Sequence, residues 1–278
     1  MWHFIAASVA GTSHTIDSVP CQDAADARIV EHKSQSFFLV VCSDGAGSAT
    51  HAQIGSAKAV AVGIDIVAAF VSENGLEGVN QDVVLSWFFE IHKALQQEAT
   101  QRSIDLAALH CTLLMAVLGA DKSLFAQIGD GAMVIERGSS LEVVFWPQSG
   151  EFSNATYFVT SADLTSQVEI AILPESPDQL AVFTDGLERL VLNFAGKCPH
   201  EPFFRQMFSA LLATEDTGQL NEKLCHFLSS EHVNDRTDDD KTLVLAVRIG
   251  EKMQTTGDES LTAQRIEVSG IQPLPGDC

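Results

Sequence analysis

The apolar positions along the chain predict an alternation of strands and helices. A continuous apolar run at 37–42, typical of a strand buried on both faces, is followed by an Ala- and Val-rich helix at 51–73. A second helix at 80–102 is amphipathic. The remaining elements are predicted as strands at 3–10, 109–118, 123–128, 132–136, 141–146, 180–183 and 242–249, and as helices at 202–213 and 217–230.

The order of these elements predicts β-sheets covered by helices, which is an α/β layered domain of about 250 residues. In the second helix, Trp87, Phe88 and Phe89 are expected to belong to the core. The strands at 37–42 and 180–183 each run into a turn that contains an Asp-Gly pair.

Composition and charge indicate a globular, strongly acidic protein. The chain of 278 residues is 46% hydrophobic, which is ample for a sizeable core. Sixteen Lys and Arg against 37 Asp and Glu give a formal net charge of −21, so nucleic acid and anionic membrane surfaces are excluded as expected partners. The six cysteines show no zinc-ligand spacing.

The location is expected to be cytoplasmic. The first residues lack the basic stretch and apolar core of a signal peptide. The most apolar stretch, 59–71, is interrupted by Asp65 and is shorter than the ~20 residues that a membrane-spanning helix needs. From residue 251 to residue 278 the chain is polar and without periodicity, which predicts a flexible tail after a domain at 1–250.

Several aspartates stand at the ends of predicted buried strands. Asp44 and Asp185 stand in the loops that follow such strands, and Asp239 and Asp240 precede the last one. Because strand ends can converge at the edge of a sheet, these carboxylates suit a hard cation such as Mg²⁺ or Mn²⁺, which prefers oxygen ligands. Asp-Gly is also a common turn signal, and the Asp run at 238–240 also suits a solvated loop. The residues alone leave both alternatives open.

The ordered motifs resemble those of the metal-dependent serine/threonine phosphatases, the PPM or type 2C family. The similarity is greatest to a bacterial subgroup whose first motif ends in Cys-Gln-Asp, and the matches extend over about residues 6–247. The segments that carry the resemblance are Gly11-Thr12-Ser13-His14 with Cys21-Gln22-Asp23, Ser43-Asp44-Gly45-Ala46-Gly47, His110-Cys111-Thr112 with Ile128-Gly129-Asp130-Gly131, Gly150-Glu151-Phe152-Ser153-Asn154-Ala155-Thr156, Phe183-Thr184-Asp185-Gly186-Leu187 and Asp239-Asp240-Lys241-Thr242.

The resemblance implies a fold and a reaction. The fold is an α-β-β-α sandwich of two packed, mainly antiparallel β-sheets flanked by helices. The reaction is hydrolysis of phosphoserine and phosphothreonine by a water that two Mn²⁺ or Mg²⁺ ions activate, without a covalent intermediate. The implied partners are phosphorylated protein substrates within a serine/threonine kinase system.

The resemblance also assigns roles by position. The implied catalytic residues are Asp23, Asp44, Asp185 and Asp239. Asp44 would bridge two ions, Asp185 and Asp239 would hold the first, and Asp23 would belong to the second. The Gly45 carbonyl would be a further ligand, and Asp130 matches the position of a third, weaker ion.

Two departures from the family pattern concern the substrate phosphate. Ser18 stands where the family often has an arginine, and Gly131-Ala132 replaces a Ser-Arg pair. The predicted substitutes for the missing arginine are His14, Arg28 and Lys33. The loss also motivates an alternative function, a catalytically weak or inactive phosphatase-fold protein that binds a partner.

A haloacid-dehalogenase-like phosphatase is excluded. That chemistry needs an aspartate two residues before the second aspartate of its motif, and here Phe183 precedes Asp185 at that position.

Because the composition of residues 251–278 favours disorder, a chain that ends at Gly250 should keep both its melting temperature and its turnover of a small phosphoester. Thermal unfolding and a p-nitrophenyl phosphate assay on the two lengths of chain test this expectation. A large loss of either property would show that the segment packs on the domain.

Overall fold

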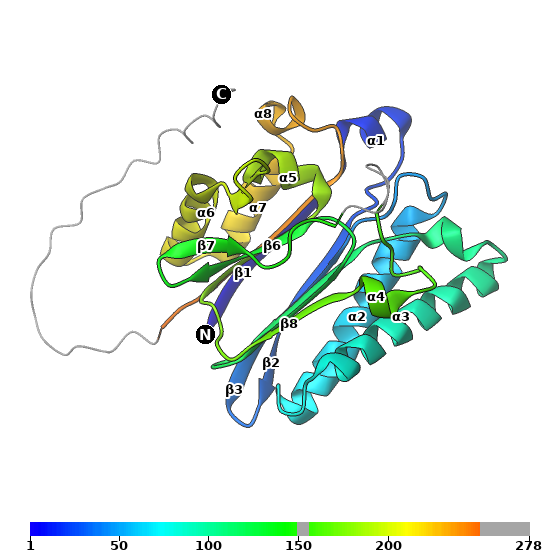
Figure 1. Ribbon diagram of the computed structural model, residues 1–278. Coiled ribbons are helices and arrows are strands. Elements are labelled where there is room, and N and C mark those ends of the chain that lie inside the picture. The colour runs from blue at the N-terminus through cyan, green and yellow to red at the C-terminus, as the bar shows by residue number, and fades with distance from the viewer. Residues whose placement is uncertain (149–155, 251–278) are drawn as a thin grey trace, which may run out of the picture.

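The structure is a computed structural model that describes residues 1–148 and 156–250. Its centre is a pair of five-stranded sheets packed face to face, with helices on both outer faces (Figure 1). The expected layered fold of two antiparallel sheets is therefore confirmed. The expected tail at 251–278, and residues 150–155 of the motif at 150–156, lie outside the described residues.

Every pair of neighbouring strands is antiparallel within the described residues. The first sheet has the order β1 (Trp2–Val9), β12 (Lys241–Arg248), β9 (Gln179–Phe183), β6 (Ala132–Arg137), β7 (Ser140–Val143). The second has the order β2 (Ala24–His32), β3 (Gln35–Ser43), β4 (Leu113–Leu118), β5 (Ser123–Ile128), β8 (Glu169–Leu173). A small ribbon is formed by β10 (Leu192–Asn193) and β11 (Cys198–Pro199).

The helices form the two outer layers. The long helices α2 (Ala52–Asn74) and α3 (Gln81–Arg102) cover the second sheet, and α6 (Glu201–Ala213) and α7 (Thr217–Leu228) cover the first (Figure 1). The shorter helices are α1 (Thr12–Asp17), a 3₁₀ turn η1 (Leu106–Leu109), α4 (Leu164–Gln167), α5 (Asp185–Val191) and α8 (Glu231–Asn234).

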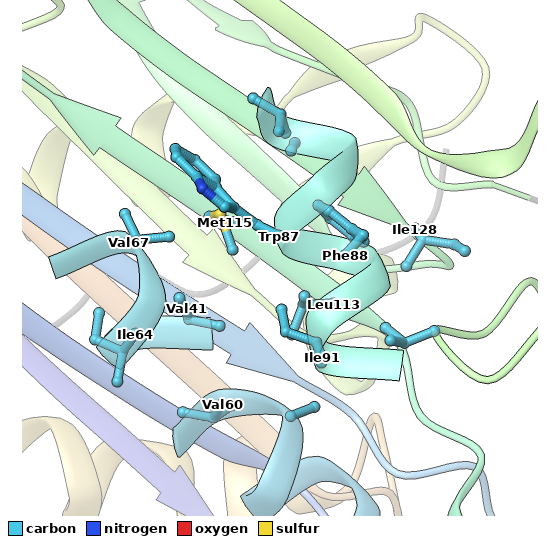
Figure 2. Packing of buried hydrophobic residues seen from close by; sticks show 14 of the residues in the cluster. Val41, Val60, Ile64, Val67, Trp87, Phe88, Ile91, Leu113, Met115 and Ile128 are labelled. Atoms are coloured by element: carbon cyan, nitrogen blue, oxygen red, sulfur yellow. The ribbon is translucent and has the colours of Figure 1, made fainter. Parts of the chain in front are cut away.

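The alternation of side chains along β3 explains why its apolar run is continuous. Phe37, Leu39 and Val41 pack into the core beneath α2 and α3, and Figure 2 shows Val41 among residues of that core. Phe38 and Val40 point the other way, into the core between the sheets. A strand in the inner layer is buried on both faces, so both sets of positions must be apolar.

Three expectations from the sequence need correction. Phe89 is 48% exposed and does not belong to the core, because it lies about 100° around α3 from Phe88, which is fully buried. Asp185-Gly186 is the first turn of α5 rather than a separate turn, since acidic residues are favourable there. The apolar stretch at 59–71 is part of α2, which by length and composition alone could cross a membrane; one face of α2 packs in the core of the fold.

The two phenylalanines provide a matched test of the inter-sheet core. Phe38 is fully buried, with its ring centroid 5.6 Å from that of Trp2 and 5.3 Å from that of Phe4. Phe38→Ala should lower the free energy of unfolding by about 3–5 kcal/mol, because it leaves a cavity between the sheets. Phe89→Ala removes the same atoms from an exposed site and should change it by less than ~1 kcal/mol. Denaturant unfolding of both variants measures the difference, and equal losses would contradict this assignment of the core.

Candidate metal centre

The register of the strands brings the acidic motifs to one edge of the sandwich. In the first sheet, Phe183 at the end of β9 lies opposite Leu243 near the start of β12, and opposite Ala132 at the start of β6. In the second sheet, Ser43 at the end of β3 lies opposite Ala24 at the start of β2. Antiparallel pairing therefore places the segments that carry Asp23, Asp44, Asp130, Asp185 and Asp239 at the same end of the two sheets.

Three carboxylates at this edge converge closely. One carboxylate oxygen from each of Asp44, Asp130 and Asp185 lies within 4.8 Å of the other two, and all three side chains are half-buried. Ligand oxygens around a hard cation stand at comparable spacings, since each lies ~2.0–2.6 Å from the ion. The three line one cavity together with Asp239. This group has the donor set and spacing of a divalent-cation site.

Asp23 is buried, does not line this cavity, and is held by two hydroxyls. Its Oδ2 accepts hydrogen bonds from Thr184 Oγ1 and Thr242 Oγ1, each at 2.8 Å. Its Oδ1 is buried and has no hydrogen-bond partner within the described residues. A buried carboxylate oxygen without a partner is costly, and a bound cation would satisfy it. The residues present thus fit a divalent metal ion.

Asp239 lines the cavity, whereas the side chain of its neighbour Asp240 is buried among the loops. Its buried carboxylate accepts hydrogen bonds from the backbone N–H groups of Gly11, at 2.7 Å, and Gln22, at 2.5 Å. The Gln22 carbonyl in turn accepts from the Gly45 N–H at 3.2 Å. Gly186 lies against the Asp240 carbonyl so closely that any Cβ would overlap with its oxygen. This network connects the loops that carry Asp23, Asp44, Asp185 and Asp239.

Burial and mutual repulsion raise the pKa values of the clustered carboxyls. Desolvation, followed by the charges of Asp130 and Asp239, raises the pKa of Asp185 to about 8. Desolvation raises the pKa of Asp23 to about 6, against the effect of its two threonine donors. The pKa of Asp44 is also raised well above its usual range, through desolvation and then the charge of Asp23. These groups are poised to exchange their protons for a cation.

The sequence assigned no role to several residues at this edge. Glu188 lines the cavity, and its Oε1 accepts a hydrogen bond from the Gly131 N–H at 2.7 Å. Its pKa is raised to about 7, mainly by desolvation. Thr156 Oγ1 donates to Asp130 Oδ2 at 2.6 Å. Glu188 stands three residues after Asp185 and shares a helix face with it, a relation that becomes visible once 185–191 is recognised as a helix.

The cavity has a volume of about 780 Å³ and a mixed lining. Two arginines that sequence reasoning did not single out, Arg189 and Arg236, form part of it. The full lining comprises Asp44, Ala46, Gly47, Ser48, Asp130, Trp146, Pro147, Gln148, Thr156, Phe158, Asp185, Gly186, Glu188, Arg189, Phe194, Arg236, Thr237, Asp238 and Asp239.

The three predicted phosphate-binding residues are absent from this lining. His14 Nδ1 lies 2.9 Å from Asp240 Oδ1, which also accepts a hydrogen bond from the Gly11 N–H. The Arg28 guanidinium pairs with Asp26 at 2.8 Å and with Asp65 at 2.7 Å, on β2 and α2. Lys33 is exposed, with its ammonium 3.9 Å from Glu77. Gly45 contributes its backbone to the loop network and is not among the lining residues either.

The raised pKa values predict a characteristic pH dependence of stability. A carboxyl whose pKa is higher in the folded protein stabilises it at low pH, and the contribution is lost as pH rises through the folded value. The melting temperature of metal-free protein should therefore fall as pH rises above the ordinary carboxyl value of 3.8, and the contributions of Asp23 and Asp185 should be fully lost above about 6 and about 8. Asp185→Asn should reduce this fall, whereas Asp121→Asn, on the exposed turn between β4 and β5, should not.

Metal binding should reverse the effect because it requires the ionised carboxylates. Millimolar Mn²⁺ should raise the melting temperature more at pH 8 than at pH 5. At a Mn²⁺ concentration 100 times the dissociation constant, binding should increase the free energy of unfolding by about 2.7 kcal/mol. Thermal scans with EDTA or Mn²⁺ across pH 5–9 measure both effects. A flat profile without metal, or an equal Mn²⁺ shift at both pH values, would contradict the assignment.

Comparisons with known proteins agree with this arrangement. The model of the protein phosphatase 2C family matches residues 10–229. A relative named serine/threonine-protein phosphatase 3, from Escherichia coli strain K12, is 37% identical over 249 residues, which cover 88% of this chain and 98% of the relative.

Solved structures show the same fold at low sequence identity. A bacterial serine phosphatase superimposes with a TM-score of 0.61 and 16% identity, covering 91% of this chain and 100% of that one. PppA, described as a key regulatory component of the T6SS in Pseudomonas aeruginosa, gives a TM-score of 0.58 and 18% identity over 88% of this chain and 97% of its own. Since the family model spans most of the chain and the Escherichia coli relative aligns over nearly its whole length, the chain belongs to the protein phosphatase 2C family.

Proposed function

We propose that this protein is a metal-dependent protein serine/threonine phosphatase, which hydrolyses phosphoserine and phosphothreonine in protein substrates with water as the nucleophile. Membership of the protein phosphatase 2C family and the named relative support this reaction class. The observation that carries the mechanism is the convergence of Asp44, Asp130 and Asp185 within 4.8 Å at one end of the sheets.

The proposed ligands follow from position and geometry. Asp44 lines the cavity, and the charge of Asp23 helps to raise its pKa, so Asp44 would be shared between two ions. Asp185 and Asp239 would complete one site, and Asp23 the other, with the Gly45 carbonyl as a further ligand. Asp130, held by Thr156, is the proposed ligand of a third ion. We propose Mn²⁺ or Mg²⁺ because the donors in this set are all oxygens.

The protein's own groups keep these ligands in place. When bound, the ions supply Lewis-acid stabilisation of the transferring phosphoryl group and lower the pKa of water. Thr184 and Thr242 fix the Asp23 carboxylate in one orientation through their hydroxyls. Asp240 keeps the surrounding loops together through the N–H groups of Gly11 and Gln22. The ligands are thus oriented before substrate arrives, so little reorganisation is needed during the reaction.

The proposed substrates are phosphoproteins in the cytoplasm. The family and its named relative support phosphoproteins as substrates, and we infer a cytoplasmic serine/threonine kinase system as their source. With a formal net charge of −21, nucleic acid and membrane surfaces are poor partners. We also propose that residues 1–250 form the phosphatase domain and that 251–278 are dispensable for its chemistry.

Removing one proposed ligand tests the mechanism. Asp185→Asn should lower kcat on a phosphothreonine peptide by about 10²–10⁴-fold, because metal catalysis stabilises the transition state by several kcal/mol and each 1.36 kcal/mol is a factor of ten. Asp121→Asn makes the same chemical change at an exposed turn and should keep full activity. EDTA should abolish turnover by the parent protein, and Mn²⁺ should restore it.

Two results would contradict the proposal. Retention of most of the kcat by Asp185→Asn would show that this carboxylate is not a ligand. A folded parent protein that binds Mn²⁺ but hydrolyses neither p-nitrophenyl phosphate nor the phosphopeptide would favour the alternative of an inactive, partner-binding phosphatase fold.

A further inference from the structure

The charge of the cavity poses a problem for a phosphorylated substrate. Six carboxylates line it: Asp44, Asp130, Asp185, Glu188, Asp238 and Asp239. A phosphate group at neutral pH carries close to two negative charges, so it is repelled wherever a carboxylate is not neutralised. Within the described residues, the cationic side chains of the lining are Arg189 and Arg236.

The ion pairs of the molecule distinguish these two residues from its other arginines. The described chain contains seven arginines, and five of them pair with a carboxylate: Arg28, Arg102, Arg137, Arg205 and Arg248. Arg189 and Arg236 form no such pair with a carboxylate of the described residues, although acidic groups surround both. Their guanidinium groups therefore keep their donors available for an anion that enters the cavity.

The backbone places both arginines at fixed positions relative to the carboxylate cluster. Arg189 stands four residues after Asp185 in α5, so the two side chains share one face of the helix. The opposite face of α5 is buried through Leu187 and Leu190. Arg236 stands three residues before Asp239, and its N–H donates to the carbonyl of the buried Val233 at 3.0 Å.

We propose that Arg189 and Arg236 bind the phosphate group of the substrate. They take the role for which the family often uses an arginine at the position of Ser18. A guanidinium can donate two parallel hydrogen bonds to phosphate oxygens, which gives both charge and orientation. This inference rests on the proposed function, because it concerns the substrate of the same cavity. It differs from the sequence-based expectation, which assigned the role to His14, Arg28 or Lys33.

Kinetics of single variants test the assignment. Arg189→Ala and Arg236→Ala are compared with Arg28→Ala and Lys33→Ala, which remove the same charge outside the cavity. KM and kcat are measured with p-nitrophenyl phosphate and a phosphothreonine peptide at fixed Mn²⁺, and inorganic phosphate is titrated as a competitive inhibitor. Both arginines are exposed, so melting temperatures should match that of the parent protein.

We expect each cavity variant to raise KM and the inhibition constant of phosphate by about ten-fold or more, with a smaller change in kcat, since the contact is made with bound and reacting phosphate alike. Arg→Lys at either position should recover part of the loss, because it restores charge without the paired donors. The Arg28 and Lys33 variants should behave like the parent protein.

The outcomes separate this inference from the proposed function. Unchanged KM and unchanged phosphate inhibition in both cavity variants would overturn the inference while leaving the phosphatase activity intact. A rise in KM for Arg28→Ala or Lys33→Ala alone would also overturn it. A parent protein without metal-dependent turnover would overturn the proposed function itself.

Discussion

Repulsion between carboxylates is the constraint on which the rest of this structure depends. Asp23, Asp44, Asp130 and Asp185 are held together at one end of two stacked sheets, where burial raises the cost of each negative charge. Left to themselves, such groups would separate into solvent. Asp44, Asp130 and Asp185 stay together because they stand next to β3, β6 and β9, which are largely buried and paired on both edges, so the core between the sheets fixes their positions. Asp23 precedes the edge strand β2 and is held instead by hydrogen bonds from Thr184 and Thr242.

Groups that are not proposed ligands maintain this arrangement. The hydroxyls of Thr184 and Thr242 both donate to Oδ2 of Asp23, and Oδ1 has no hydrogen-bond partner among the described residues. Asp240, only one residue from Asp239, is turned inward to the N–H groups of Gly11 and Gln22 and so acts as a link between loops. Asp239 lines the cavity whereas Asp240 links the loops, because the side chains of successive residues at a strand end point in different directions.

The same acidity shapes the recognition of substrate. A cavity built to hold cations repels a phosphate group until those cations are bound, and its aromatic wall supplies no charge. Trp146 and Phe194 meet edge to face at a centroid distance of 5.4 Å on that wall. Arg189 and Arg236, which pair with no carboxylate among the described residues, are the groups we propose for phosphate, and they are not among the proposed metal ligands.

The sequence by itself determined most strands of the inner layers, but it did not predict β2 and β8, the partly buried edge strands of the second sheet. The apolar run at 37–42, followed by a turn signal, indicated a strand buried on both faces, and an Asp shortly after such a run was expected at the end of a strand. Helix faces were less certain, because one residue decides exposure, as Phe89 beside Phe88 shows. The resemblance of the ordered motifs to the phosphatase family also grouped Asp23, Asp44, Asp130, Asp185 and Asp239 as one predicted set, since each motif is a short run of consecutive residues.

Only the tertiary structure decided which charged side chains meet. Arg28 is near Asp23 in sequence, yet β2 directs it to Asp26 and Asp65. Arg189 and Arg236 reach the cavity because α5 begins at Asp185 and because the loop after α8 leads back to Asp239. Contacts of this kind join residues far apart along the chain, and they depend on strand register and on the packing of the two sheets. No local pattern of residue types encodes that geometry.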